Sequence, residues 1–390
     1  MRVFSIIAGA VAVSLGFASA PVQAQASRPA TYRPPLASEA PIAMLVDLSS
    51  GQILHQSNPD RRFMPASITK VMTAFLAFEL IEQDILRLDQ RFRFAPASFK
   101  VWGNNGSTMF LSANDELSVS DLLLGISTVS ANDAAVVLGE GAAGSLGGWT
   151  HLMNAKAAEI GMTQSHFGTP NGLPDEGRTF VTARDLATLA TALVERHPDL
   201  YARYFGHRQL TYRGITQANH EPFTGLVRGA DGIKTGFTNE AGYGVLGSAK
   251  RGGRRLVVVV AGSDRARVRD RAARSYLEWG FSAFDSRPLF EEGTKLGSAK
   301  VQDGDRRSLS LVAGGKIAAA MPRGTDRPIS LSIHYEGPLR APIANGQQVA
   351  ELEIKVDGMP PSRVPLIAGE DVAKAGPLHR LFNGLVGWLS

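Results

Sequence analysis

The stretch Met64-Pro65-Ala66-Ser67-Ile68-Thr69-Lys70 runs directly into the mostly apolar segment Val71-Met72-Thr73-Ala74-Phe75-Leu76-Ala77-Phe78. Pro65 suits the start of a helix, and the apolar residues after it favour a helix buried in the core. Positions i and i+3 share a helix face, so we expect the Ser67 hydroxyl beside the Lys70 amine in the first turn. The free N–H groups and the dipole of a helix N-terminus favour a developing oxyanion there. The stretch therefore predicts an activated serine.

A serine needs a base within hydrogen-bond reach before it can act as a nucleophile at neutral pH. A lysine can be that base only if its pKa falls, and burial beside a second cation lowers the pKa of a lysine. The chain offers a proton relay in Ser130-Ala131-Asn132 and a second cation in Lys234-Thr235-Gly236. Together with Ser67-x-x-Lys70 they have the order and form of the S-x-x-K, S-x-N and K-T-G set.

The relay motif occurs twice, because the tetrapeptide Ser-Ala-Asn-Asp begins at Ser112 and again at Ser130. We expect the first copy to be a turn, since it lies between an apolar stretch and a new helix start. The second copy lies between the apolar runs 122–124 and 134–138, which predicts a tight loop between two buried helices. Ser130 is therefore the candidate.

These motifs, together with Asp231-Gly232-Ile233-Lys234-Thr235-Gly236-Phe237-Thr238 and Ala241-Gly242-Tyr243, resemble the low-molecular-mass penicillin-binding proteins. Within that superfamily of penicillin-recognising serine hydrolases the resemblance is to the D-alanyl-D-alanine carboxypeptidases, with further matches at 182–185 and 276–281. It covers roughly residues 40 to 390. The expected fold class is α+β: a β-lactamase/transpeptidase-like catalytic domain, in which an antiparallel sheet packs on a helical cluster, followed by a small all-β domain.

The resemblance implies three catalytic residues. Ser67 would attack the scissile carbonyl, Lys70 would be the general base, and Ser130 would pass a proton to the leaving amine. The implied substrate-binding residues are Asn132, Lys234, Thr235, Gly236, Phe237 and Arg269. We expect no cofactor and no metal, since no His-Glu-x-x-His motif is present.

The substrate-binding residues have separate expected roles. Lys234-Thr235-Gly236 should form an edge strand on which an extended peptide docks, with Gly236 allowing the substrate backbone to come close. The backbone N–H groups of Ser67 and Phe237 would form the oxyanion hole, although relatives often carry a polar residue in place of Phe237. Asn132 would offer its amide to the substrate backbone. Thr235 and Arg269 would bind the C-terminal carboxylate, but Arg269 lies in an arginine-rich segment that is also typical of a solvated basic turn.

Composition limits the class of protein. With 390 residues, 44% of them hydrophobic and 20% charged, the chain is globular and long enough for two domains. Its net charge of +5 favours an anionic surface such as a membrane or wall polymer, and no basic run with interleaved aromatics indicates nucleic acid. The absence of cysteine excludes disulfides and thiol catalysis.

The two ends of the chain predict a location outside the cytoplasm. Residues 1–24 have the pattern of a secretory signal peptide, with an uncleaved anchor as the alternative, and 25–40 would be an extended leader. The expected domains are 41–285, catalytic, and 286–375, rich in β-structure. Residues 376–390 predict an amphipathic helix lying on the membrane, unless that helix packs on its own domain. The protein would then be periplasmic and peripherally attached to the inner membrane.

The expected function is removal of the terminal D-alanine from peptidoglycan pentapeptides through an acyl-enzyme on Ser67, with β-lactams as inhibitors. Other serine hydrolases have little support, since no Gly-x-Ser-x-Gly elbow exists and none of the eight histidines lies in a recognisable catalytic motif. A serine β-lactamase would share the three motifs but would not need a β domain and a membrane helix. A catalytically silent wall-binding scaffold would not need a nucleophile with its base.

Overall fold

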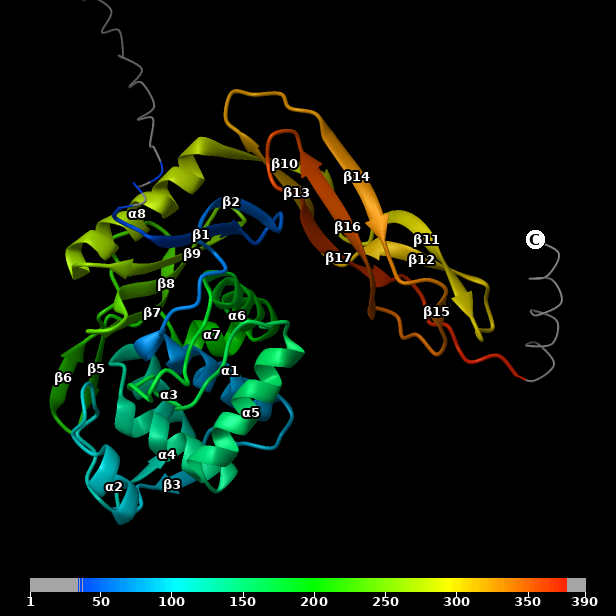
Figure 1. The fold of residues 1–390 in the computed structure, drawn as a ribbon. Coiled ribbons are helices and arrows are strands. Elements are labelled where there is room, and N and C mark those ends of the chain that lie inside the picture. Colours follow the sequence, from blue (N-terminus) through cyan, green and yellow to red (C-terminus); the bar gives the residue numbers. More distant parts are fainter. Residues whose placement is uncertain (1–33, 35, 37, 377–390) are drawn as a thin grey trace, which may run out of the picture. The chain divides into compact units, whose positions relative to one another are not determined.

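The structure of the protein is a computed structural model that describes residues 34, 36 and 38–376 (Figure 1). Its helical elements are η1 (Ala66–Ile68, a 3-10 turn), α1 (Thr69–Glu82), α2 (Pro96–Trp102), α3 (Val119–Thr128), α4 (Asn132–Ala143), α5 (Leu146–Glu159), α6 (Ala183–Arg196), α7 (Pro198–Tyr204) and α8 (Ala266–Ala283). Its strands are β1 (Ile42–Asp47), β2 (Gln52–Ser57), β3 (Arg91–Arg93), β4 (Glu116–Ser118), β5 (Gln209–Tyr212), β6 (Ile215–Ala218), β7 (Ala230–Thr238), β8 (Gly242–Arg251), β9 (Arg254–Ser263), β10 (Phe284–Phe290), β11 (Lys295–Gln302), β12 (Ser308–Ala313), β13 (Ile317–Pro322), β14 (Ile329–His334), β15 (Leu339–Arg340), β16 (Gln348–Val356) and β17 (Ser362–Ala368).

The catalytic region is built on a five-stranded antiparallel sheet with the order β2-β1-β9-β8-β7. Successive side chains of a strand point to opposite faces, and both faces of β9 are buried. Val257 and Val259 therefore join the core shared with helices α1, α3, α4 and α6. Val258 and Val260 join a second core with α8. Figure 1 shows α8 along one face of this sheet and the helical cluster along the other.

The expected elements of this region are largely present. The apolar runs 43–47 and 51–55 predict a hairpin of two strands, which appears as β1 and β2. The helix predicted after Pro65 is α1, and the helical patterns at 119–126, 132–140, 149–160 and 182–195 appear as α3, α4, α5 and α6. Thr182 followed three residues later by Asp185 predicts a capping-box-like helix start, and at the start of α6 Thr182 Oγ1 accepts the N–H of Asp185. Helix α8 was not predicted, because its many arginines obscure the apolar face that Ala272, Tyr276 and Leu277 bury.

The nucleophile turn differs from the prediction in one respect. Ser67 lies in the 3-10 turn η1, and the regular α-helix begins only at Thr69. Ala66, just before Ser67, has a φ of 50°, far from the −63° of an α-helix, so no α-helix extends back through it. Ser67 and Lys70 nevertheless come together.

The C-terminal part is all β, with a six-stranded sheet of order β14-β16-β17-β12-β11-β15 and a two-stranded pair β10-β13. Alternate residues of β16 face its core, which are Ala350, Leu352, Ile354 and Val356. The observed architecture is that of the predicted α+β class. The expected signal peptide, most of the leader and all but the first residue of the expected membrane helix lie outside the described residues. Among the described residues, no helix combines the length and the apolar character that crossing a membrane requires.

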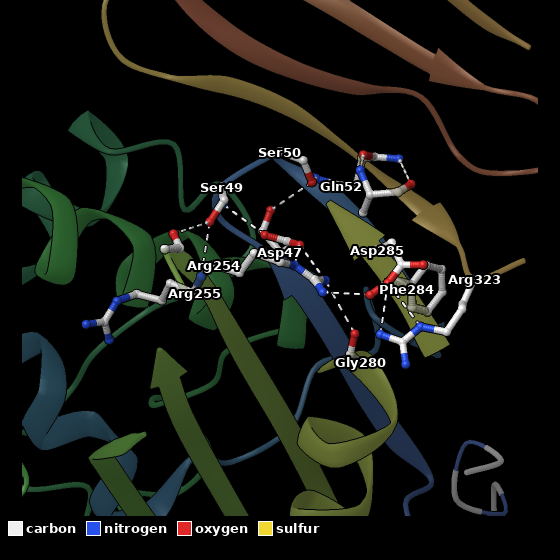
Figure 2. Close-up of polar contacts among 12 residues, drawn as sticks. Asp47, Ser49, Ser50, Gln52, Arg254, Arg255, Gly280, Phe284, Asp285 and Arg323 are labelled. Carbon is white, nitrogen blue, oxygen red and sulfur yellow. Dashed lines mark hydrogen bonds and ion pairs between the residues drawn. The ribbon is translucent and has the colours of Figure 1, made fainter. Parts of the chain in front are cut away.

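A buried ion pair fastens the sheet to the end of α8 (Figure 2). Arg254, at the start of β9, donates from Nε to Asp47 Oδ2 at 2.9 Å. The same guanidinium donates to the carbonyl oxygens of Phe284 at 2.8 Å and Gly280 at 3.3 Å. Asp47 and Arg254 are both buried and have lost most of their contact with water, so each charge is stabilised by the opposite charge beside it.

We expect Asp47→Ala to lower the free energy of unfolding by about 3–5 kcal/mol, because it leaves the buried Arg254 charge without its partner. Arg323→Ala is the matched control: Arg323 lies 2.8 Å from Asp285, but both side chains are about half exposed. Its expected cost is below about 1 kcal/mol. Urea unfolding followed by circular dichroism measures both variants. Equal losses would contradict the role given to Asp47.

Candidate active site

Ser67 and Lys70 lie together at the N-terminal end of α1, as predicted. Lys70 Nζ is 2.9 Å from Ser67 Oγ and donates to the main-chain oxygen of Asn171 at 2.8 Å. The Lys70 side chain is buried, with 1% of the residue exposed, so it is not a solvated helix lysine. The bond to Asn171 fixes one N–H of the amine, which allows the nitrogen lone pair of the neutral form to face the Ser67 hydroxyl.

The site contains the second cation that a lysine base requires. Burial lowers the pKa of Lys70 well below its usual value of 10.5, and the charge of Lys234 lowers it further, while Asp133 acts in the opposite direction. Burial also lowers the pKa of Lys234, to about 7, with Arg269 as the next cause and Glu221 opposing. Because both lysines are desolvated, holding two positive charges here is costly, and a neutral Lys70 is favoured.

Ser130 and Asn132 lie where α3 passes into α4. Ser130 is buried and has φ = 61°, a left-handed conformation that a serine adopts only when its surroundings impose it. Asn132 is the first residue of α4, and its Nδ2 donates to Asn105 O at 2.7 Å. Its Oδ1 is buried and has no hydrogen-bond partner among the described residues. An unpaired acceptor of this kind suits an N–H group of a substrate.

The residue that holds this loop was not singled out from the sequence. Asp133 accepts the N–H groups of Met109 at 3.0 Å, Leu111 at 3.1 Å and Ala134 at 2.8 Å. Burial raises the pKa of Asp133, and these N–H groups act against that rise. The signal was available, because Asp133 is the fourth residue of the second Ser-Ala-Asn-Asp tetrapeptide. The first copy, at Ser112, forms a turn as predicted.

Strand β7 carries Lys234, Thr235 and Gly236 and is an edge strand, which confirms the prediction. The buried amine of Lys234 donates to Thr235 O at 3.1 Å. The expected approach of a substrate backbone to Gly236 stays a prediction, and a group of the protein itself already lies close to this glycine. A Cβ there would lie 2.3 Å from the carbonyl oxygen of Pro65. Gly236 thus allows β7 to pack directly on the nucleophile turn.

The other two predicted binding residues lie beside Tyr243. Phe237 is 48% exposed and stacks on Tyr243, with ring centroids 4.2 Å apart. Arg269 lies in the first turn of α8 and is buried, so the alternative of a solvated basic turn is wrong. Its guanidinium donates to Gly244 O at 3.0 Å and to Asp270 Oδ1 at 2.7 Å. Its binding of a substrate carboxylate stays a prediction.

Two further segments reach the site without having been predicted. Asn171, the partner of Lys70, lies in a loop held on α1 by a bond from Thr73 Oγ1 to Pro170 O at 2.7 Å. His220 follows β6, and burial, Lys234 and Arg269 all lower its pKa, which places it near both cations. No motif marks these positions, because each is brought in by the fold of a loop.

The family models agree with this geometry. Residues 27–265 match the model described as D-alanyl-D-alanine carboxypeptidase, Peptidase_S11. Residues 284–374 match the model of the penicillin-binding protein 5 C-terminal domain.

Curated relatives match along most of their length. D-alanyl-D-alanine carboxypeptidase DacC of Escherichia coli is 32% identical over 346 residues, covering 87% of this chain and 86% of the relative. The corresponding enzyme DacF of Bacillus subtilis is 30% identical over 359 residues, covering 90% and 91%.

Among solved structures, penicillin-binding protein 5 from Haemophilus influenzae has a TM-score of 0.72 at 30% identity, covering 88% of this chain and 99% of its own. Penicillin-binding protein D2 from Listeria monocytogenes, in its ampicillin-bound form, has a TM-score of 0.58 at 30% identity, covering 64% and 100%. The chain belongs to the D-alanyl-D-alanine carboxypeptidase family. It is a serine-type carboxypeptidase of the low-molecular-mass penicillin-binding class, with the fold class predicted from its sequence.

We expect Gly236→Ala to slow acylation by a β-lactam by about 100-fold, because the new Cβ meets the Pro65 carbonyl and displaces β7 from the nucleophile turn. Gly244→Ala is the matched control, since Gly244 pairs with Gly236 in β8 but a Cβ there meets its nearest atom at 3.4 Å. The measurement is the rate at which a fluorescent penicillin acylates each variant and the wild type. A normal rate in Gly236→Ala would contradict the close packing.

Proposed function

We propose that the protein removes the terminal D-alanine from peptidoglycan stem peptides through an acyl-enzyme on Ser67. One observation supports this most directly. Lys70 is buried between Ser67 Oγ and Asn171 O, and a second buried lysine, Lys234, lowers its pKa. A lysine placed in this way is a base for the serine beside it.

In the proposed acylation step, Ser67 Oγ attacks the carbonyl carbon of the penultimate D-alanine while its proton passes to Lys70 Nζ. The negative charge on the tetrahedral oxygen is stabilised by the main-chain N–H groups of Ser67 and Phe237. The C–N bond then breaks, and Ser130 hands its proton to the departing amine of D-alanine while it takes up the proton held by Lys70, which restores the neutral base. A water molecule hydrolyses the ester, returning the Ser67 hydroxyl and the shortened peptide.

Substrate binding in this proposal uses the edge of β7 as a template for an extended peptide. The buried Oδ1 of Asn132 accepts an N–H group of the substrate backbone. Thr235 and Arg269 bind the terminal carboxylate. Penicillins acylate the same serine, because their β-lactam carbonyl and carboxylate occupy the same positions.

The test is release of D-alanine from a peptide ending in D-Ala-D-Ala, with mass spectrometry after incubation with a penicillin. We expect wild type to release D-alanine and to carry one adduct on Ser67. Lys70→Ala should lose both activities, because the serine then has no base. Ser67→Ala is the control for adducts at other residues.

Three results would overturn the proposal. Normal acylation of Lys70→Ala would refute the base. Rapid penicillin hydrolysis without D-alanine release would identify a β-lactamase, and neither adduct nor release would identify a scaffold.

We propose that the protein works in the periplasm, peripherally attached to the inner membrane. Support comes from the sequence: residues 1–24 have the form of a secretory signal, and the end of the chain has an amphipathic pattern. In that pattern apolar residues recur at helical spacing, namely Leu378, Leu381, Phe382, Leu385, Val386 and Leu389.

Deleting residues 377–390 should release the protein from membrane pellets while leaving D-alanine release in solution unchanged. The apolar stripe supplies the membrane affinity in this account, and the catalytic residues all precede it. Fractionation of cells expressing either form is the measurement. Membrane association that survives the deletion would refute the anchor.

A further inference from the structure

The strand that carries Lys234 has an irregularity three residues earlier. β7 pairs with β8, and the register shifts between Ala230 and Gly232. Asp231 is the residue at this shift, so its main-chain groups fall outside the regular ladder. β7 lies at the edge of the sheet, so among the described strands it pairs with β8 on one side and with no strand on the other. Side-chain contacts can therefore hold the first part of β7 in place in addition to its ladder with β8.

Tyr201 of α7 supplies one of these contacts. Its hydroxyl lies 3.0 Å from Asp231 O and 2.9 Å from Asp231 Oδ1, and donates its proton to one or the other. The Tyr201 ring is buried and stacks on Phe205 at a centroid distance of 5.2 Å. Burial and the charge of Asp231 hold the pKa of Tyr201 well above 10.0, so the hydroxyl stays a donor at neutral pH.

Arg255 of β9 binds the other carboxylate oxygen of Asp231. Its Nη1 lies 2.7 Å from Asp231 Oδ2 and donates to Ser248 Oγ at 2.6 Å. Ser248 is the β8 residue that pairs with Gly232, at the register shift itself. Asp231 is therefore bound from a helix on one side and from the sheet on the other.

Helix α7 is also fastened to α3, the helix that leads to Ser130. Ser127 Oγ donates to Tyr204 O at 2.6 Å, and the Tyr204 hydroxyl lies 2.9 Å from Ser120 Oγ. Tyr201 and Tyr204 lie on this one helix. Hydrogen bonds through α7 thus connect the segment before Ser130 with the segment before Lys234.

We propose that Asp231, held by Tyr201 and Arg255, is a positioning residue that sets where β7 places Lys234 relative to Lys70, and thereby tunes the catalytic base. The proposal rests on the proposed acyl-enzyme function. None of these three residues is assigned a contact with the reacting atoms. They act through the strand, and loosening them would let β7 shift and admit water around both lysines.

The sign of the effect follows from the causes of the pKa shifts. Burial is the largest cause for both lysines, so admitting water raises both pKa values. A higher pKa leaves less neutral Lys70 at a given pH, and a rise of about one unit costs about tenfold in rate below the pKa. The other titratable or charged groups that act on the two lysines, or share their surroundings, are Asp133, His220, Glu221 and Arg269. The test leaves all of them unchanged.

The test is the pH dependence of acylation by a fluorescent penicillin, measured on full-length Tyr201→Phe. We expect acylation near pH 7 to fall about tenfold and the acid limb of the profile to move up by about one pH unit. Asp231→Asn is the second variant, which keeps the main-chain acceptor but removes the charge that Arg255 binds. It should shift the limb in the same direction, and it serves alone if Tyr201→Phe does not fold.

The matched control is Tyr276→Phe, which also removes one hydroxyl from a buried tyrosine. The Tyr276 hydroxyl lies 3.1 Å from His55 Nε2, in the core that α8 forms with the sheet. We expect it to lower the melting temperature without moving the pH profile. An unmoved acid limb in both test variants, with acylation intact in wild type, would overturn the inference. Absence of any adduct in wild type would instead refute the proposed function.

Discussion

Two lysine side chains are buried in one site, and this burial constrains the rest of the catalytic region. Lys70 and Lys234 are 1% and 3% exposed. Burial is the largest cause of the fall in both pKa values; the charge of Lys234 lowers the pKa of Lys70 further, and the charge of Arg269 lowers the pKa of Lys234 further. Repulsion between these charges would destabilise the fold if the surrounding main chain did not compensate. Carbonyl oxygens do so: Asn171 O accepts from Lys70 and Thr235 O accepts from Lys234.

The architecture follows from bringing these lysines together from distant parts of the chain. Lys70 enters on α1, inside the helical cluster, and Lys234 enters on the edge strand of the sheet. The two meet because Gly236 removes the side chain that would keep β7 away from the nucleophile turn. Within the sheet, alternate valines of β9 pack into the cores on its two faces, and this close packing leaves the central strands little freedom to shift. In the proposal above, Asp231 and its two partners, Tyr201 and Arg255, likewise restrict the movement of the start of β7.

What the sequence could predict was local. The spacing of Ser67 and Lys70 within one turn, the apolar run after them and the edge strand around Lys234 each depend on residues close together in the chain. Asn171 escaped prediction because it acts through its carbonyl oxygen, which every residue type possesses. The Asp133 bonds to Met109 and Leu111 join segments more than 20 residues apart, and no periodicity reveals such pairs. The close packing of Gly236 on the Pro65 carbonyl could not be predicted, because the fold brings these two residues together from distant parts of the chain.

The proposed mechanism requires Lys70 to be neutral in the resting enzyme, and titration of the Lys70 amine itself tests this requirement. Protein labelled with ¹³C-lysine would be titrated by NMR, with the Lys70 and Lys234 signals assigned from spectra of Lys70→Ala and Lys234→Ala. We expect Lys70 to titrate well below 10.5 and Lys234 at about 7. A Lys70 signal that titrates near 10.5 would mean that the amine is charged at neutral pH, and would contradict its role as the base for Ser67.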